Sequence, residues 1–251
     1  MSNRSDNFIY GIRSAIEAIR AGKEIDKVFI RQGAKSELAI ELFGLIRKEK
    51  IPYQFVPVQR LNRITQKNHQ GVITFLSLIS YYTVEQILPG IYESGENPFI
   101  LVLDQISDVR NFGAIIRTAE CAGVHAVVIP KKGSAQINPD AVKTSAGALH
   151  TMPVCRNEEV SEAVKYMKDS GLHIVAATEK AKNIYHNARF DRPLAIILGS
   201  EEKGISEKLL ELADERIKIP LKGKIESLNV SVTAGILIYE AVKQRNNTGL
   251  K

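Results

Sequence analysis

Residues 99–119 read FILVLDQISDVRNFGAIIRTA. The apolar run Phe99–Leu103 leads into a polar, glycine-containing stretch, after which apolar residues return. The run has the length of a strand and is far short of the roughly 20 apolar residues that a membrane helix needs. A strand without polar positions is typical of a parallel sheet that helices cover on both faces.

The same pattern recurs toward the C-terminus. We expect strands at 100–104, 125–129, 151–154, 173–178, 194–198 and 216–219, helices between them, and a last helix over 229–244. Strands that alternate with helices predict an α/β fold on a parallel sheet. Ligands of such sheets bind beyond the carboxyl ends of the strands, so the residues after each strand are the candidates for a site.

Three strand ends carry polar, glycine-containing stretches, which we call the first (residues 103–119), second (197–206) and third (219–232) segments. The second has the glycine spacing of a phosphate loop, but Ile205 stands where that loop needs a lysine. No G-x-G-x-x-G or G-x-S-x-G motif and no metal-ligand spacing of histidines occurs. The residues alone indicate a ligand site without a metal, made of glycines, amides, hydroxyls, one arginine and one glutamate. They do not fix the reaction.

Residues 8–79 form a pattern of their own. We expect a small α/β unit with helices at 11–21 and 36–48, Ser36 capping the second helix, and strands at 28–30, 53–56 and 71–77. The loop-like stretches 60–63 and 67–71 combine basic and amide side chains. Such side chains suit contacts with the phosphates and bases of a nucleic acid.

Residues 81–97 contain the turn signals Pro89-Gly90, Ser94-Gly95 and Asn97-Pro98 within one short stretch. We therefore expect a linker at 81–97, which joins a small domain at 1–80 to a larger domain at 98–251.

All of the excess positive charge lies in residues 1–80, which hold 13 Lys and Arg against 7 Asp and Glu, whereas residues 81–251 hold 21 of each. A basic module beside a neutral one suggests that the first part grips a polyanion. A solvated surface that aids solubility explains the same charge. Cys121 and Cys155 have no CxxC spacing, and the first residues lack the apolar core of a signal peptide. We expect a cytoplasmic protein with reduced cysteines and no membrane association.

The three segments, in their order and spacing, resemble the three motifs of the SpoU (TrmH-like) RNA ribose 2′-O-methyltransferases of the SPOUT superfamily, over about residues 99–245. Residues 8–79 resemble the small substrate-binding domain of one branch, which modifies a guanosine of 23S ribosomal RNA. The stretches 123–130 and 134–138 are similar to that branch as well. Three long motifs are far more specific than one short motif.

The resemblance implies a catalytic SPOUT domain with a deep C-terminal trefoil knot, preceded by a small α/β RNA-binding domain. It implies S-adenosylmethionine as the methyl donor, bound in a bent shape without a metal. It also implies a homodimer, with the active site near its interface, that acts on 23S ribosomal RNA. Three alternatives stay open: a transfer RNA 2′-O-methyltransferase, an enzyme for an adenosine of ribosomal RNA, and a non-catalytic RNA-binding assembly protein.

The motif residues carry over one at a time. The resemblance gives catalytic roles to Asn111 and Arg117 of the first segment, Glu201 of the second, and Ser227 and Asn229 of the third. It places the cofactor, largely through main-chain groups, against Thr178, Leu198, Gly199, Ile219 and Leu228. We expect Gly199 to let the main chain approach the cofactor.

Two positions depart from the family pattern. Val109 replaces a common proline of the first motif, and Glu202 replaces a frequent glycine of the second. If that glycine is needed for a positive φ, Glu202 strains the backbone of the second segment.

Simpler roles compete with the catalytic ones. Arg117 could form an ion pair on a helix surface, Glu201 could pair with Lys203 or Lys224, and the others could cap helices: Asn111, Ser227 and Asn229. The resemblance makes Arg117 the general base, helped by an RNA phosphate. Because arginine stays protonated in proteins, we favour a cation that holds the phosphate and stabilises the forming alkoxide.

Overall fold

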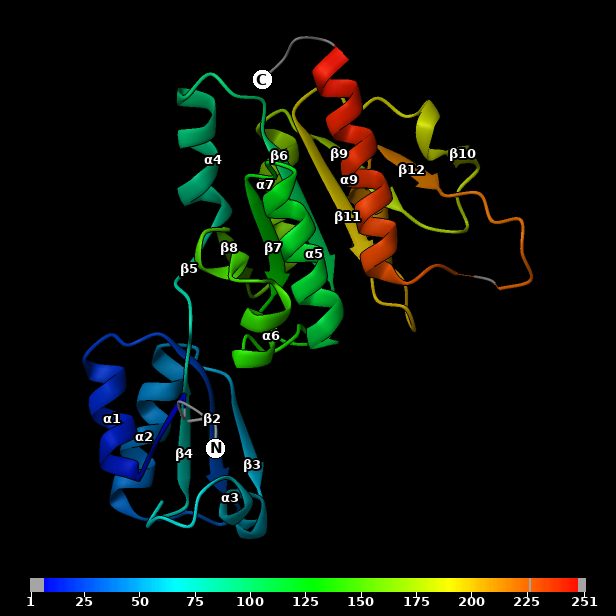
Figure 1. Cartoon of the computed structure of the whole chain (residues 1–251). Coiled ribbons are helices and arrows are strands. Elements are labelled where there is room, and N and C mark those ends of the chain that lie inside the picture. Colours follow the sequence, from blue (N-terminus) through cyan, green and yellow to red (C-terminus); the bar gives the residue numbers. More distant parts are fainter. Residues whose placement is uncertain (1–6, 226, 248–251) are drawn as a thin grey trace. The chain divides into compact units, whose positions relative to one another are not determined.

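Eight parallel strands form the sheet of the second part of the chain, within the described residues 7–225 and 227–247. In order across the sheet they are β10 (Asn183–Ile184), β12 (Glu215–Lys218), β9 (His173–Ala177), β11 (Leu194–Gly199), β6 (Phe99–Asp104), β7 (Ala126–Pro130), β8 (Val154–Asn157) and β5 (Tyr81–Tyr82). Every neighbouring pair runs parallel in this computed structural model (Figure 1). The predicted α/β fold with a parallel sheet is confirmed.

The chain divides into two compact units, residues 1–80 and 81–251. The outermost residues of the two predicted domains, 1–6 and 248–251, lie outside the described residues, as does Glu226 of the third segment.

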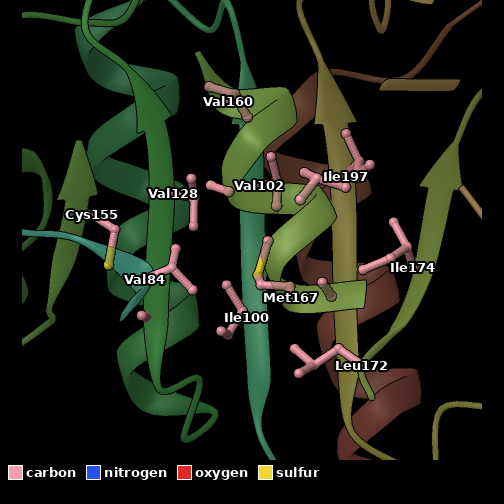
Figure 2. Packing of buried hydrophobic residues seen from close by; sticks show 14 of the residues in the cluster. Val84, Ile100, Val102, Val128, Cys155, Val160, Met167, Leu172, Ile174 and Ile197 are labelled. Atoms are coloured by element: carbon pink, nitrogen blue, oxygen red, sulfur yellow. The ribbon is translucent and has the colours of Figure 1, made fainter. Parts of the chain in front are cut away.

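Helices cover both faces of the eight-stranded sheet. One face carries α4 (Val84–Glu93), α7 (Val160–Asp169) and α8 (Glu207–Leu212), and the other carries α5 (Val109–Cys121) and α9 (Val230–Asn247), with α6 (Pro139–Thr144) packed against α5. Figure 2 shows Val160 of α7 over strands that contribute Val102 and Ile197. Because successive strand residues point to opposite faces, a sheet buried on both sides needs unbroken apolar strands. In the described ranges, no helix combines the length and the apolar character needed to cross a membrane.

Residues 81–97 are not the linker that we predicted. They contain β5, which pairs with β8, and α4. Val84, Leu88 and Ile91 of α4 are spaced for one helix face and are buried in the core of the second unit. The turn signal Pro89-Gly90 lies inside α4, so tertiary packing outweighs the local preference of these two residues for a turn.

Other boundaries differ more modestly. β8 begins at Val154 rather than at 151, because residues Ala148–His150 form a 3-10 turn, η1, and Thr151 ends it. A second 3-10 turn, η2 (Tyr185–Asn187), follows β10.

The first unit is a smaller α/β layer. Its described part, from residue 7 to 80, has a four-stranded sheet in the order β1 (Phe8–Tyr10), β4 (Val72–Leu76), β2 (Ile25–Arg31) and β3 (Tyr53–Val56), with helices α1 (Ile12–Arg20), α2 (Glu37–Lys48) and α3 (Val58–Ile64). Ser36 caps α2 as predicted, since its hydroxyl accepts the Ala39 amide at 3.2 Å. Residues 60–63 belong to α3 and are not the loop that we expected, because Leu61 is buried against the sheet.

Arg245 ties the last helix to the starts of two central strands. Its guanidinium donates to the carbonyls of Asn97 (2.9 Å), Pro98 (2.8 Å) and Arg192 (2.8 Å), and more weakly to that of Phe190 (3.3 Å). Burial lowers the pKa of Arg245 to about 10, which leaves the group protonated at neutral pH. The charge of this partly buried cation is thus stabilised mainly by carbonyl dipoles.

Candidate active site

The first and second segments begin at neighbouring strand ends. β6 and β11 pair in register, with Leu103 opposite Leu198 and Asp104 opposite Gly199. The third segment leads from the sheet into α9. The three segments therefore meet at the carboxyl edge of the sheet, where parallel-sheet proteins place their ligands.

Asn111, Glu201 and Asn229 form one hydrogen-bonded network, which draws one residue from each segment. The Asn229 side-chain amide donates to Glu201 Oε1 and to Asn111 Oδ1, both at 2.9 Å. Asn111 Nδ2 lies 3.3 Å from Glu201 Oε1, which also accepts the Val230 backbone amide at 3.1 Å. A carboxylate at the start of α9 is favoured by the helix dipole.

Helix capping, the simpler role considered for Asn111 and Asn229, is found for only one of them. Asp108, not Asn111, caps α5, because its Oδ1 accepts the Asn111 backbone amide at 2.7 Å. The Asn111 side chain is thereby left for the network. Asn229 does both jobs: its Oδ1 accepts the Ser231 amide at 3.0 Å, as a helix cap does, while its Nδ2 serves the network.

A cavity of about 380 Å³ adjoins this network. It is lined by all five residues predicted to bind the cofactor: Thr178, Leu198, Gly199, Ile219 and Leu228. Ser227 and Glu201 line it as well. Its size is within the range of small-molecule sites, roughly 300–1,000 Å³.

The chemistry of the cavity fits S-adenosylmethionine. Ile219, Leu221 and Leu228 offer apolar surface for an adenine ring. The described charged lining residues are three acids and three lysines, which suits a ligand that carries both positive and negative groups: Glu179, Glu201, Glu202, Lys180, Lys203 and Lys218. Across the described ranges, no group of three or more His, Cys, Asp or Glu side chains could hold a metal ion.

Gly199 is needed for packing within the protein itself, in addition to the approach to the cofactor that we predict. A Cβ at this position would lie 2.2 Å from the carbonyl carbon and 2.3 Å from the carbonyl oxygen of Gly204. The second segment folds back on itself there, and the Gly204 amide donates to the Ser200 carbonyl at 2.8 Å. The glycine lets two stretches of this protein's own main chain meet, and this folded loop then walls the cavity.

Asp104 is a residue that the sequence did not single out. It ends β6, is only 5% exposed, and its Oδ2 accepts the Ser206 amide at 2.7 Å. It thereby fixes the far end of the second segment. A lone acid after five apolar strand residues was the available signal, because a buried carboxylate requires a hydrogen-bond partner.

Arg117 is not brought into the network. It follows Asn111 by six residues on α5, which places it on a different helix face, and its side chain is exposed. It lines neither the 380 Å³ cavity nor the cavity of about 310 Å³ beside Asn111. The ion pairs found among the described residues do not include it, so the structure does not support the simpler role of a surface ion pair either.

The two departures from the family pattern cause no strain. Val109 is the first residue of α5, a position that accommodates proline and other residues alike. The described non-glycine residues with positive φ are Lys50, Gln70, Gln105 and Ala146, so Glu202 has ordinary backbone geometry.

Comparisons with known proteins agree with this site. Residues 98–239 match the model of the SpoU rRNA Methylase family, and residues 8–82 match the model described as RNA 2′-O ribose methyltransferase substrate binding. A Bacillus subtilis protein, YacO, named as a TrmH family tRNA/rRNA methyltransferase, is 32% identical over 99% of this chain and 100% of its own length.

Two solved structures extend the comparison. A structure described as an RNA 2′-O ribose methyltransferase is 27% identical, with a TM-score of 0.56, and covers 95% of this chain and 88% of that one. The TrmH/SpoU tRNA modifying enzyme of A. aeolicus is also 27% identical, with a TM-score of 0.56, but covers 66% of this chain and 86% of its own. The chain described here therefore belongs to the SpoU rRNA Methylase family.

Proposed function

We propose that this protein methylates the ribose 2′-hydroxyl of a guanosine in 23S ribosomal RNA. As a member of its family, the chain is an S-adenosylmethionine-dependent RNA 2′-O-ribose methyltransferase. The N-terminal unit is the observation that carries the ribosomal assignment. It matches the substrate-binding model and holds the whole charge excess, whereas the A. aeolicus tRNA enzyme has no counterpart for about a third of this chain.

Five residues of the 380 Å³ cavity are proposed to hold the methyl donor: Thr178, Leu198, Gly199, Ile219 and Leu228. When bound, S-adenosylmethionine supplies an electrophilic methyl group on a positively charged sulfur. Methyl transfer to an oxygen creates little new charge, so alignment of the acceptor and exclusion of water are the main tasks left to the protein.

Asn111, Glu201 and Asn229 are proposed to carry out that alignment. Glu201 Oε1 is occupied by N–H groups, and Oε2 receives no hydrogen bond from the described residues. We assign to Oε2 the hydrogen of the ribose 2′-hydroxyl: this carboxylate oxygen orients the hydroxyl and accepts its proton as the oxygen is methylated. Ser227 lines the same cavity and can donate a further hydrogen bond to the ribose or the cofactor.

Arg117 is proposed to act across the interface of a homodimer. In one subunit it is exposed and lies outside both cavities, so Arg117 of the partner subunit would hold the RNA phosphate next to the site. Exposed apolar side chains on α9, Val232 (50% exposed) and Tyr239 (52% exposed), suit an interface along α9 and the neighbouring α5.

Mapping of ribose methylation in RNA from a strain that lacks the gene tests the assignment. We expect one 23S guanosine to lose its 2′-O-methyl group, and wild-type protein but not Glu201→Gln to restore it. Loss of a transfer RNA or an adenosine modification would overturn the proposed substrate. Restoration by Glu201→Gln would overturn the proposed role of the network. We also propose a cytoplasmic location, which rests on the proposed substrate.

A further inference from the structure

A second cavity, of about 310 Å³, lies on the other side of the network. Residues that line it include Gln105, Ser107 and Asp108 of the first segment, Gly133 of the following loop, and Glu202 and Lys203 of the second segment. It shares Ser200, Glu201, Glu202, Lys203 and Val230 with the cofactor cavity. The two cavities are therefore separated by one wall, which is the second segment and the start of α9.

This position suits the acceptor nucleotide. Methyl transfer requires the acceptor oxygen to come within about 3–3.5 Å of the methyl carbon, in line with the bond that breaks. An acceptor must therefore enter from a space next to the donor site. Glu201 lines both cavities, and its hydrogen-bond partner Asn111 lines the second. Sequence-specific RNA-binding proteins read unpaired bases that are splayed out of the strand.

The lining favours N–H groups over phosphate. It holds three carboxylates, those of Asp108, Glu201 and Glu202, against the single ammonium of Lys203 among the described lining residues. Asp108 and Glu201 are already engaged through one oxygen each. The Glu202 carboxylate makes no hydrogen bond or ion pair with the described residues, so both of its oxygens are open to a ligand.

The end of β6 presents an amide to the same space. Gln105 lines the cavity with φ 57, in the left-handed region. The backbone beyond it is held in place, because the Ile106 carbonyl accepts the Ala135 amide at 2.8 Å. An amide can donate to a carbonyl oxygen and accept from an N–H.

We propose that this cavity receives the base of the target nucleotide and selects guanine, a proposal that rests on the proposed function. Guanine presents two adjacent donors, N1–H and the N2 amino group, beside the O6 acceptor. Glu202 accepts from both donors, and Gln105 donates to O6. Adenine and cytosine each replace part of this pattern with an acceptor, and uracil offers a single N–H between two carbonyls.

The test measures nucleoside binding by ligand-observed NMR, with the full chain saturated with S-adenosylhomocysteine. We expect guanosine to bind more tightly than inosine, which lacks the N2 amino group, and more tightly than adenosine, cytidine and uridine. Glu202→Gln should reduce the guanosine-to-inosine preference by roughly tenfold, the effect of losing a charge-assisted hydrogen bond. Glu207→Gln, an exposed neighbour on α8 outside both cavities, should leave the preference unchanged.

The readout is a ratio within each variant, so a change in cofactor affinity does not affect it. Equal binding of guanosine and inosine, or an unchanged ratio in Glu202→Gln, overturns the proposal. The pentamers UUGUU and UUIUU, where I is inosine, repeat the comparison with a base presented by RNA, and a preference seen only for free nucleosides also overturns it. Failure to bind S-adenosylhomocysteine contradicts the proposed function instead.

Discussion

Asn229 acts both as a helix cap and as a member of the hydrogen-bonded network, two roles that the sequence alone presents as competing explanations. Its oxygen caps α9, and its nitrogen joins Glu201 to Asn111, residues that precede it by 28 and 118 positions. A helix cap contributes about 1 kcal/mol to stability, whereas a preorganised hydrogen-bond donor in an active site changes rates by roughly 10²–10³. The two roles can therefore be separated by a substitution at position 229 that keeps the helix cap but removes the side-chain N–H groups.

Asn229→Ser should preserve stability and lose activity. Serine is as good a cap as asparagine, but it cannot span Glu201 and Asn111 with two N–H groups. We expect the free energy of unfolding to change by less than about 0.5 kcal/mol and the single-turnover methylation rate to fall by roughly 10²–10³. The control is Asn138→Ser, the same exchange at the cap of α6, where Oδ1 accepts the Ala141 amide. Full activity in Asn229→Ser would show that this residue serves only as a helix cap.

The Arg117 substitutions separate a cation from a base. Lysine keeps the charge but loses the planar fork that grips a phosphate through two hydrogen bonds. We expect Arg117→Lys to retain weak activity, Arg117→Ala to fall by roughly 10²–10³, and both to bind S-adenosylhomocysteine normally. Single-turnover rates against pH should share one profile in all three proteins. Lysine has a lower ordinary pKa than arginine, so a profile that moves to lower pH in the lysine variant would make Arg117 the base.

The sequence indicated which polar residues follow the strands, but not which of them form hydrogen bonds with one another. Buried parallel strands exclude polar residues, so a polar residue after an apolar run marks the edge of the sheet. The hydrogen bond between Asn111 and Glu201 joins residues 90 positions apart, and no local pattern encodes it. Asp104 escaped notice because the apolar run predicts the strand without requiring that the acid at its end be buried.

At the scale of elements, the second segment works as a folded loop held at both ends. Its start is closed by Gly199 against Gly204, and its end by Asp104 through the Ser206 amide. It lines both cavities, so its conformation should affect both of the proposed ligands. By contrast, α4 was missed because its buried positions are interrupted by Pro89-Gly90, and only packing against the sheet shows that the helix continues.

Gly199→Ala should open this loop. Even one methyl group would contact the Gly204 carbonyl group at 2.2–2.3 Å, so the main chain has to move. We expect at least a roughly tenfold loss of S-adenosylhomocysteine affinity by calorimetry. The control is Gly90→Ala inside α4, where a Cβ meets nothing within 4 Å. It should bind normally and gain about 0.5–1 kcal/mol of stability. Normal affinity in Gly199→Ala would show that the loop's conformation does not matter for binding.

At the scale of the whole molecule, the two units divide charge and chemistry. The excess positive charge lies in residues 1–80, and both cavities lie in residues 81–251. The trefoil knot implied by the family stays a prediction, because strand order and register do not state which segment passes through which loop.

Two truncations test that division and the boundary. A fragment that starts at Tyr81 should fold and bind S-adenosylhomocysteine, but lose most RNA affinity and much of its salt dependence. A fragment that starts at Asn97 lacks α4. Burial of Val84, Leu88 and Ile91 contributes roughly 1.5–3 kcal/mol per side chain, against a typical net stability of about 5–15 kcal/mol. We expect it to melt far lower or not to fold. Full RNA affinity in the Tyr81 fragment would contradict the division.

Mixed dimers test whether Arg117 acts across the interface. Arg117→Ala and Glu201→Gln subunits, each inactive alone, should recover activity when they are unfolded and refolded together, because one site of each heterodimer then has an intact Glu201 and the partner's Arg117. Random pairing predicts roughly a quarter of the wild-type rate for a two-fold dimer. If Arg117 acts within its own subunit, every site carries a lesion and no activity returns.

The contacts of Arg245 affect the order in which the two units of this protein can finish folding during synthesis. The carbonyls of Asn97 and Pro98 emerge from the ribosome early, yet their shared donor Arg245 follows 148 and 147 residues later. The first unit contains its own core and can form while translation continues. The Pro98 carbonyl also accepts the Leu194 amide at 2.8 Å, but the Asn97 carbonyl gains its Arg245 hydrogen bond only after α9 has emerged. A nascent chain thus presents the basic RNA-binding unit well before its methyltransferase unit is finished.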